Sequence, residues 1–291
     1  MRVKVKQLKD LHDEIYDNVA RALQEDIGSG DLTASLIPSE SKLSAVVISR
    51  EDAVLCGAQW FEACFLVLAP RTIITWFAND GDLVQSGKKL CEIQGDSRDL
   101  LTAERSALNF LQMLSAVATQ TKRFVDALVG TKAVIVDTRK TLPGLRLAQK
   151  YAVTCGGGLN HRMGLYDGIL IKENHIIAAG SIQSALNKAQ EIAPPGTILQ
   201  IEVESLLELQ EALAAGAVMV LLDNFTLSQL SEAVILAHQI SGRQVILEAS
   251  GNITLDNVRQ VAETGIDRIS IGGLTKNIQA IDLSMRFKGS E

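Results

Sequence analysis

The stretches Val134-Ile-Val-Asp-Thr-Arg-Lys140 and Gly168-Ile-Leu-Ile-Lys172 carry the pattern that decides the fold. In each stretch a short apolar run stops at basic residues, as expected where a buried strand of an α/β protein ends. Between them lie Gly156-Gly-Gly158 and then His161 and Arg162. Ligands of α/β folds bind at the carboxyl ends of the strands. Because the net charge of the chain is -6, these cations are a local feature, and they predict a site for an anionic small molecule.

From about residue 134 onward the chain repeats one unit, which is an apolar run of strand length, a polar end and an amphipathic helix. The six runs are 134–136, 168–171, 198–203, 218–222, 244–247 and 268–271. Capping-box spacings and terminal glycines mark the helices between them, at Ser205 with Glu208, Thr226 with Gln229, Gly216, Gly242 and Gly265. This alternation predicts a parallel α/β barrel. Since only six runs are clear, we expect an incomplete barrel with a seventh strand elsewhere.

The first part of the chain follows a different rhythm and predicts a second domain. A helix is expected around 15–24, and β-like segments at 43–49 and 72–77 are followed by turn signals near 79–82 and 85–87. These features favour a bent antiparallel sheet. A long helix at 100–114 then connects this domain to the barrel.

Composition excludes several classes of protein. No apolar run approaches the roughly 20 residues of a membrane span, and residues 1–9 lack the apolar core of a secretory signal. The acidic balance without a basic tail argues against nucleic acid as a partner. We therefore expect a cytoplasmic protein with no membrane or nucleic-acid partner.

The four cysteines, Cys56, Cys64, Cys91 and Cys155, form no CxxC pair and have no His partner at metal-ligand spacing. Neither a structural zinc site nor a disulfide scaffold is predicted. Cys155 abuts the glycine run and could act as a nucleophile, but no motif supports that role.

Lys172 gives the strongest single signal among the cations, because an unpaired ammonium at the end of a buried strand is costly. Its partner could be a ligand anion, a carboxylate such as Glu202 or Glu204, or a carbonyl substrate that forms a Schiff base. Arg139 and Lys140 could instead be a solvated loop. Their place at a strand end favours binding of carboxylate or phosphate.

Carboxylates and small residues end the later strands. Glu202, Glu204 and Asp223 could be ion-pair partners, or could bind ribose hydroxyls and the Mg²⁺ that accompanies a polyphosphate, which we favour. The last two strands end in Glu248-Ala-Ser250-Gly251-Asn252 and Gly272-Gly273. Small residues in these loops are typical of a phosphate site built from backbone N–H groups.

Together these motifs resemble the quinolinate phosphoribosyltransferase family over essentially the full length. The motifs are Ala22-Leu-Gln-Glu-Asp-Ile-Gly-Ser-Gly-Asp-Leu-Thr33, Ala103-Glu-Arg-Ser-Ala-Leu-Asn-Phe-Leu111, Asp137-Thr-Arg-Lys-Thr-Leu-Pro-Gly144, Gly158-Leu-Asn-His-Arg-Met-Gly164, Ile171-Lys-Glu-Asn-His175, Glu202-Val-Glu204, Leu222-Asp-Asn-Phe225 and Glu248-Ala-Ser-Gly251. The resemblance implies an N-terminal open-faced α/β sandwich and an incomplete, seven-stranded C-terminal α/β barrel. We expect the sandwich at 1–114, joined by 276–291, and the barrel at 115–275.

The resemblance further implies transfer of phosphoribose from phosphoribosyl pyrophosphate to quinolinate, with decarboxylation to nicotinate mononucleotide. It implies Mg²⁺ as cofactor and a homodimer in which Arg105 completes the partner's site, and we expect a trimer of such dimers. The implied catalytic residues are Lys140, Lys172, Glu202 and Asp223, with Glu202 and Asp223 reaching the metal through the bound pyrophosphate substrate. The other implied substrate-binding residues are Arg105, Thr138, Arg139, His161, Arg162, Glu248, Ser250, Gly251, Asn252, Gly272 and Gly273.

Three alternatives stay open. A related transferase could act on nicotinate, although the surplus of cations favours a substrate with two carboxylates. A barrel of the aldolase type could use Lys172 as a Schiff-base lysine, which leaves the Arg residues without a role. The segment 81–91 resembles the hairpins of biotinyl and lipoyl carriers, which leaves the barrel unexplained.

Overall fold

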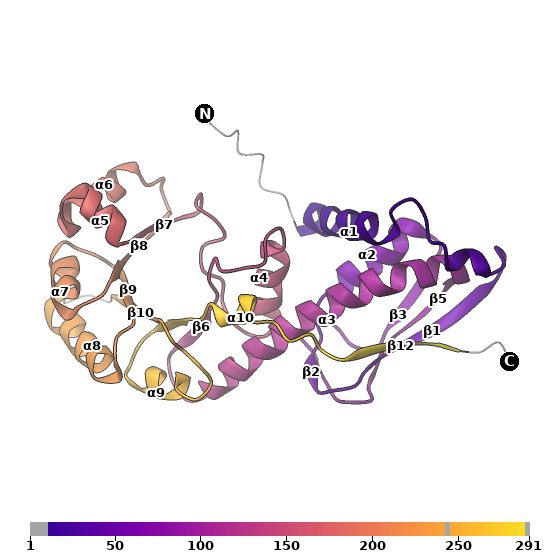
Figure 1. The fold of residues 1–291 in the computed structure, drawn as a ribbon. Coiled ribbons are helices and arrows are strands. Elements are labelled where there is room, and N and C mark those ends of the chain that lie inside the picture. The colour runs from indigo at the N-terminus through magenta and orange to yellow at the C-terminus, as the bar shows by residue number, and fades with distance from the viewer. Residues whose placement is uncertain (1–10, 242–244, 289–291) are drawn as a thin grey trace. The chain divides into compact units, whose positions relative to one another are not determined.

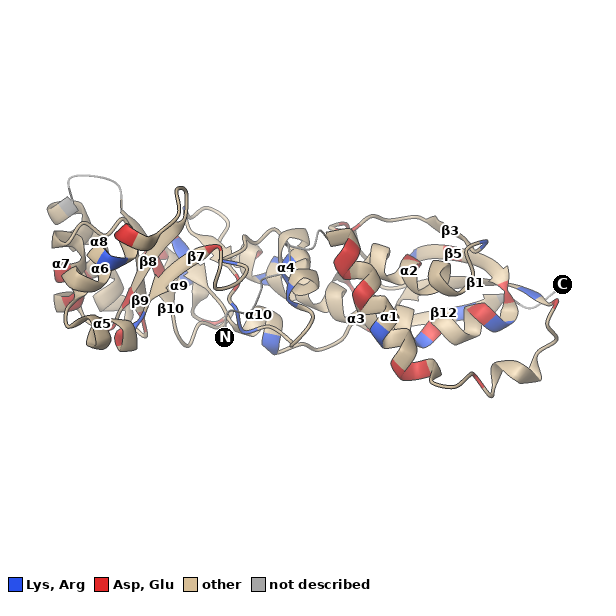
Figure 2. Cartoon of the chain, turned by 90° about the horizontal axis from the view of Figure 1, so that it is seen from above, with Lys and Arg blue, Asp and Glu red and all other residues tan. Residues whose placement is uncertain are grey.

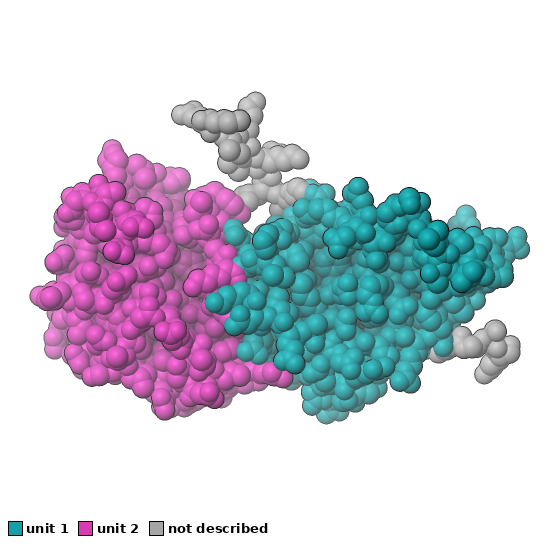
Figure 3. All heavy atoms as spheres, in the orientation of Figure 1, with its two compact units in different colours: residues 1–120, 141–157, 275–291 teal, residues 121–140, 158–274 magenta. Residues whose placement is uncertain are grey.

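The computed structural model describes residues 11–241 and 245–288. The chain divides into two compact units, one made of Met1–Gln120, Thr141–Gly157 and Thr275–Glu291, and one made of Thr121–Lys140 and Gly158–Leu274 (Figure 3). Three features of the sequence prediction lie outside the described residues, namely 1–9, Gly242 and the start of the fifth strand at Gln244. The two units group residues by the contacts they make and do not define domain boundaries. The domain limits at 114 and 275 therefore stay predictions.

The first unit is built on an antiparallel sheet. Its strand order is β12 (Leu283–Lys288), β1 (Lys42–Ser49), β5 (Lys89–Asp96) and β3 (Ile73–Trp76), and β2 (Ala53–Val54) pairs separately with β4 (Leu83–Val84). The helical elements are α1 (Leu11–Ile27), the 3₁₀ turn η1 (Ala34–Leu36), α2 (Ala58–Leu68), α4 (Arg146–Cys155) and most of α3 (Ser97–Ala127) (Figure 1). Trp60, Phe61 and Phe65 of α2 are fully buried and form the centre of the core.

The second unit contains the parallel sheet that the repeating pattern predicts (Figure 1). Its order is β6 (Val134–Val136), β11 (Arg268–Ser270), β10 (Ile246–Ser250), β9 (Met219–Asp223), β8 (Ile198–Val203) and β7 (Gly168–Ile171). The helices are α5 (Glu173–Ala179), α6 (Ile182–Ile192), α7 (Leu206–Ala214), α8 (Leu227–Ser241) and α9 (Val258–Glu263), and α10 (Gly273–Lys276) lies at the boundary of the units. Leu159 adds a one-residue parallel bridge to Val136, which supplies the seventh strand position. The fold is an α/β barrel without backbone closure between Leu159 and β7.

The local signals for the barrel helices are confirmed where the chain is described. The Ser205 side chain accepts the N–H of Glu208 at the start of α7, and Thr226 and Gln229 exchange capping bonds at the start of α8. Each cap satisfies N–H groups that the helix itself leaves free. Among the described residues, no helix is both long enough and apolar enough to cross a membrane.

Four charged residues lie within the strands of the second unit, and the remaining charges lie on its helices and loops (Figure 2). They are Glu202, Asp223, Glu248 and Arg268. The sequence pattern ends the fifth strand at Leu247 because Glu248 is charged. The strand continues to Ser250, since Glu248 lies opposite Arg268 of β11 and pairs with it at 2.9 Å.

Candidate active site

A cavity of about 230 Å³ lies at the carboxyl ends of the barrel strands, within the second unit. The segments after β6, Leu159 and β7 contribute cations, and β8, β9 and β10 contribute carboxylates. The lining consists of Thr138, Arg139, Lys140, His161, Arg162, Leu170, Lys172, Glu202, Leu221, Asp223, Glu248, Ser250 and Ser270. Parallel strands bring their ends to one edge, so these distant segments share one site.

Most of the predicted site residues meet in this cavity. Of the predicted set, Arg105, Gly251, Asn252, Gly272 and Gly273 do not line it. Arg105 belongs to the first unit, where it is exposed on α3 and forms no hydrogen bond or ion pair with other described residues. Gly251 and Asn252 lie in the loop after β10, Gly272 lies in the loop after β11, and Gly273 is the first residue of α10.

Lys172 is paired with a carboxylate. Its Nζ lies 2.5 Å from Glu202 Oε2, and the two side chains are 47% and 14% exposed. Of the three partners that the sequence left open, the structure therefore shows the carboxylate of the next strand. Asp223 accepts a hydrogen bond of 2.8 Å from Asn224 Nδ2. Carboxylates at the ends of β8 and β9 thus share one cavity with the cations that follow β6 and β7.

Arg162 is held in the cavity by a hydrogen bond to the backbone. Its Nη1 donates to the carbonyl of Gly168 at 3.1 Å. Burial lowers the pKa of Arg162 below its ordinary value, and the neighbouring Arg139 lowers it further. Two guanidinium groups that disfavour each other in this way create a strong preference for an anion between them.

The ring of His161 is held by the protein at both nitrogens. Nδ1 accepts the backbone N–H of Arg162 at 2.7 Å, so the neutral ring carries its proton on Nε2, which lies 2.8 Å from Gln200 Oε1. The His161 N–H donates to Asp137 Oδ1 at 2.9 Å. These bonds fix the turn that presents Arg162, so His161 acts first as a support for its neighbour.

The buried ion pair of Glu248 and Arg268 lies beside His161, and we call it the floor of the cavity. Glu248 is fully buried, and its Oε2 accepts from Arg268 Nε at 2.9 Å, while its Oε1 lies 3.7 Å from His161 Nε2. Sequence reasoning missed Gln200 and Arg268. The available signal was a polar residue inside each apolar run, since such a residue needs a buried partner.

The loop after β10 has a backbone that suits an anion. Asn224 and Asn252 are the described non-glycine residues with positive φ, and Asn252 Nδ2 donates to Asn224 Oδ1 at 3.2 Å. A Cβ at Gly251 would lie 2.1 Å from Asn224 Oδ1, so only glycine fits there. In the described part of the chain, the N–H groups of Gly251 and Gly272 donate to no acceptor. Such N–H groups can receive phosphate oxygens.

The donor atoms also suit Mg²⁺, which prefers carboxylate and phosphate oxygens. The pKa of Glu204 is raised above its ordinary value, most by Glu173 and further by Asp223 and Glu202. Like charges gathered in this way favour a divalent cation. Within the described residues, Glu202 and Asp223 belong to no group of three such ligand atoms within 4.8 Å.

Comparisons with known proteins find one family over nearly the whole chain. Residues 31–115 match the family model of the quinolinate phosphoribosyl transferase N-terminal domain, and residues 117–286 match that of the C-terminal domain. The nicotinate-nucleotide pyrophosphorylase (carboxylating) of Mycobacterium leprae is 40% identical over 280 residues, which cover 94% of this chain and 97% of that protein. A quinolinate phosphoribosyltransferase (decarboxylating) of Nicotiana tabacum is 38% identical and covers 91% and 80%.

Solved structures show the same similarity. The nicotinate-nucleotide pyrophosphorylase of Francisella tularensis has a TM-score of 0.92 at 44% identity, covering 96% of this chain and 98% of that one. The human nicotinic acid phosphoribosyltransferase has a TM-score of 0.63 at 14% identity, over 96% and 74%, and therefore shares the fold alone. The chain belongs to the quinolinate phosphoribosyltransferase family.

Proposed function

We propose that this protein transfers the phosphoribosyl group of phosphoribosyl pyrophosphate to the ring nitrogen of quinolinate. The 2-carboxylate leaves as carbon dioxide, and the products are nicotinate mononucleotide and pyrophosphate. Family membership supports the reaction. The observation that carries it is the lining of one cavity by cations from the segments after β6, Leu159 and β7 and by carboxylates from β8, β9 and β10.

The cationic side is the proposed quinolinate subsite. Arg139, Arg162 and Lys172 provide positive charge, and guanidinium groups bind carboxylates through two parallel hydrogen bonds. Lys172 can exchange Glu202 for a substrate carboxylate because its side chain is almost half exposed. A substrate with two carboxylates uses more of this charge than nicotinate, which has one.

The phosphoribosyl pyrophosphate subsite is proposed along the other side. Lys140 is close to Gly272, where a Cβ would lie 2.8 Å from Lys140 Cδ, and the free N–H groups of Gly251 and Gly272 are suited to phosphate. Glu202 and Asp223 would hold the ribose hydroxyls and, through the substrate, Mg²⁺. When bound, Mg²⁺ supplies charge neutralisation for the pyrophosphate.

The residues of this chain contribute orientation and electrostatics. As the bond from the anomeric carbon to pyrophosphate breaks, positive charge develops on the ribose, and Glu202 and Asp223 stabilise it. Lys140 stabilises the leaving group. After ring ribosylation, the positively charged ring nitrogen stabilises the carbanion left by carbon dioxide, so the protein needs only to hold the ring in place.

We also propose a cytoplasmic homodimer in which Arg105 enters the partner's cavity, and assembly of these dimers into a trimer. The supporting observation is that Arg105 is exposed and unbonded within the described residues. Mixing Arg105→Ala with Lys172→Ala protein tests this, because subunit exchange should restore activity at one site of each mixed dimer. Two inactive proteins that stay inactive after proven exchange would overturn it.

The function itself is tested with purified protein, Mg²⁺ and phosphoribosyl pyrophosphate, with quinolinate or nicotinate as acceptor. Carbon dioxide and mononucleotide from quinolinate alone are expected. Product from nicotinate alone would mean that the protein is a nicotinate phosphoribosyltransferase instead. Product from neither, together with a borohydride-trapped adduct at Lys172, would favour the Schiff-base alternative, which requires a neutral lysine.

A further inference from the structure

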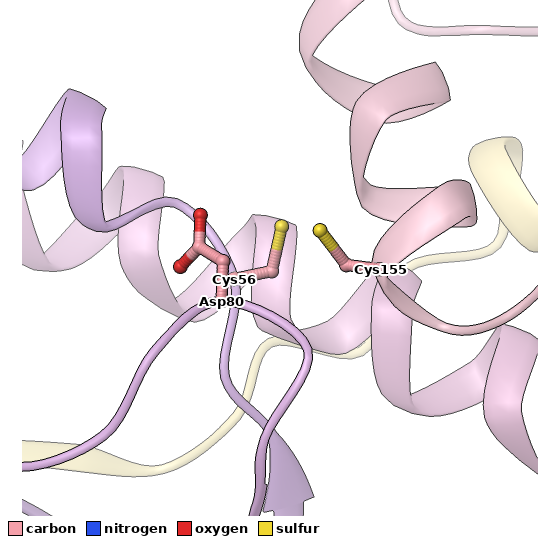
Figure 4. Close-up of side chains that lie close together, drawn as sticks. All are labelled: Cys56, Asp80 and Cys155. Atoms are coloured by element: carbon pink, nitrogen blue, oxygen red, sulfur yellow. The ribbon is translucent and has the colours of Figure 1, made fainter.

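Two cysteines that are far apart in the sequence meet in the first unit. Cys56 lies in the loop between β2 and α2, and Cys155 is the last residue of α4. Their sulfur atoms and an Asp80 carboxylate oxygen all lie within 4.8 Å of one another. Figure 4 shows the two sulfurs pointing toward each other, with Asp80 on the side of Cys56. Both thiols are free.

The two thiols differ in exposure and in acidity. Cys56 is fully buried, whereas Cys155 is half-buried. A hydrogen bond from the Cys56 thiol is the largest cause that lowers the pKa of Cys155, with a further contribution from Tyr151, and burial opposes it. Burial and the same hydrogen bond raise the pKa of Cys56. Cys155 is therefore the nucleophile of the pair, and Cys56 is its proton donor.

Asp80 is engaged as a structural cap. Its Oδ2 accepts the N–H of Gly57 at 3.1 Å and the Tyr151 hydroxyl at 2.9 Å, and its Oδ1 accepts the N–H of Ala58 at 3.1 Å. The carboxylate thus satisfies the first N–H groups of α2 and compensates the positive end of that helix. A metal ion would have to compete with these donors and to deprotonate buried Cys56, so the arrangement favours thiol chemistry over metal binding.

We propose that Cys56 and Cys155 are a site of oxidation at which a hydroperoxide generates an intramolecular disulfide. The Cys155 thiolate attacks the peroxide, the O–O bond breaks, and a proton completes the release of water or alcohol, leaving a sulfenic acid. The Cys56 sulfur then attacks Cys155, forming the S–S bond, and the sulfenic hydroxyl leaves as water with the Cys56 proton. The sulfurs are the reductant and the peroxide is the oxidant.

The backbone next to Cys56 and Cys155 contains glycines that allow the two sulfur atoms to move from within 4.8 Å of each other to bonding distance. Gly57 follows Cys56 with φ of 104°, and Gly157 lies two residues after Cys155 with φ of 84°. Helix α4 ends at Cys155, so its side chain can move without breaking the helix interior. The chain continues through Gly156-Gly-Gly158 to His161 and Arg162. A disulfide would therefore restrain the segment that leads into two cavity residues.

The remaining cysteines provide internal controls. Burial raises the pKa of both Cys64 and Cys91 to about 12, so neither forms thiolate at neutral pH. In the reduced native protein, Cys155 should react with iodoacetamide roughly tenfold faster than Cys64 or Cys91.

The test treats the reduced full-length protein with hydrogen peroxide, then denatures it, alkylates free thiols and maps the peptides by mass spectrometry. A cross-linked peptide pair containing Cys56 and Cys155, with Cys64 and Cys91 alkylated, is the expected result. In Cys56→Ser, Cys155 should stop at the sulfenic acid, which dimedone traps, whereas Cys64→Ser should form the disulfide as the wild type does.

The mapping of the wild type needs no variant, so the proposal stays testable if Cys56→Ser fails to fold. Cys155 that remains alkylatable after peroxide treatment would overturn it, as would a disulfide between two chains. One equivalent of Zn²⁺ bound by the reduced protein and lost in Cys155→Ser would assign the cluster to metal binding instead.

Discussion

Two ion pairs in the same barrel differ mainly in their exposure to water. Lys172 and Glu202 lie 2.5 Å apart at the mouth of the cavity and are 47% and 14% exposed. Arg268 and Glu248 lie 2.9 Å apart at the floor and are 19% and 0% exposed. Water can solvate Glu202 at the mouth if Lys172 is lost. Water cannot solvate fully buried Glu248 at the floor if Arg268 is lost. The upper pair is therefore available to a ligand, and the lower pair is part of the structure.

The physical difference is the desolvation of the charges. An exposed pair contributes about 0–1 kcal/mol to stability, since solvent screens it. Removal of one partner from a buried pair leaves an uncompensated charge and costs about 3–5 kcal/mol. The following substitutions examine whether this distinction holds.

The largest expected effect is that of Arg268→Ala on stability. The substitution leaves fully buried Glu248 without its guanidinium partner, so the free energy of unfolding should fall by about 3–5 kcal/mol. Urea unfolding followed by circular dichroism measures the loss. Arg268→Met combined with Glu248→Gln should recover part of it, and a loss below about 1 kcal/mol would mean that the floor pair behaves like the mouth pair.

Lys172→Ala should affect activity far more than stability. Loss of one charge contact to the reacting groups should lower kcat/KM by about 10²–10³-fold, while the unfolding midpoint changes little because Glu202 can be hydrated. Lys188→Ala, which removes an exposed pair with Glu191, is the matched control and should leave both quantities unchanged. Equal rates for the two variants would refute the assignment of Lys172 to the reaction.

Gly251→Ala should destabilise the protein and weaken phosphoribosyl pyrophosphate binding, because the loop at Gly251 has no room for a side chain. The added Cβ would lie 2.1 Å from Asn224 Oδ1, and φ is 97°, so we expect a loss of about 1–3 kcal/mol and a higher KM for phosphoribosyl pyrophosphate. Gly196→Ala, which has φ of 82° but open space around it, separates backbone strain from the steric clash. Equal losses in both variants would show that the contact with Asn224 is unimportant.

The smallest effect is expected for Glu204→Gln. Nearby carboxylates, Glu173 first, raise the folded-state pKa of Glu204, so its charged form destabilises the fold above that pKa. The substitution should therefore raise the melting temperature slightly at neutral pH and have no effect well below pH 4.5, where the carboxyl is protonated in both states. A difference that persists in acid, measured by thermal denaturation, would indicate a cause other than charge.

The sequence predicted the parts of this structure that depend on neighbours along the chain. Strand ends and helix caps such as Ser205 follow local rules, so the cavity cations were found before the structure. Pairings between strands are not local. The partner of Lys172 was left open among three possibilities, and Arg268 was missed because its role depends on the register of β10 and β11.

The contact between the two cysteines is a second example of a feature that could not be predicted from neighbouring residues. No spacing rule connects Cys56 with Cys155, since their approach depends on how α4 packs in the first unit. The sequence suggested no disulfide scaffold because it carries no CxxC pair, and all four cysteines are free in the structure. Long-range proximity carries no signal in one sequence, and only the folded structure reveals it.

The single bridge at Leu159 has a mechanical consequence. In a barrel closed by backbone hydrogen bonds, the number and stagger of the strands fix the diameter. Here the sheet runs from Leu159 to β7 without such closure, and the hydrogen bond from Arg162 to the Gly168 carbonyl, at 3.1 Å, spans the open seam. A ligand that draws Arg162 away from Gly168 releases this link. Because this hydrogen bond links the two sides of the seam, we expect a ligand bound at Arg162 to change the width of the seam.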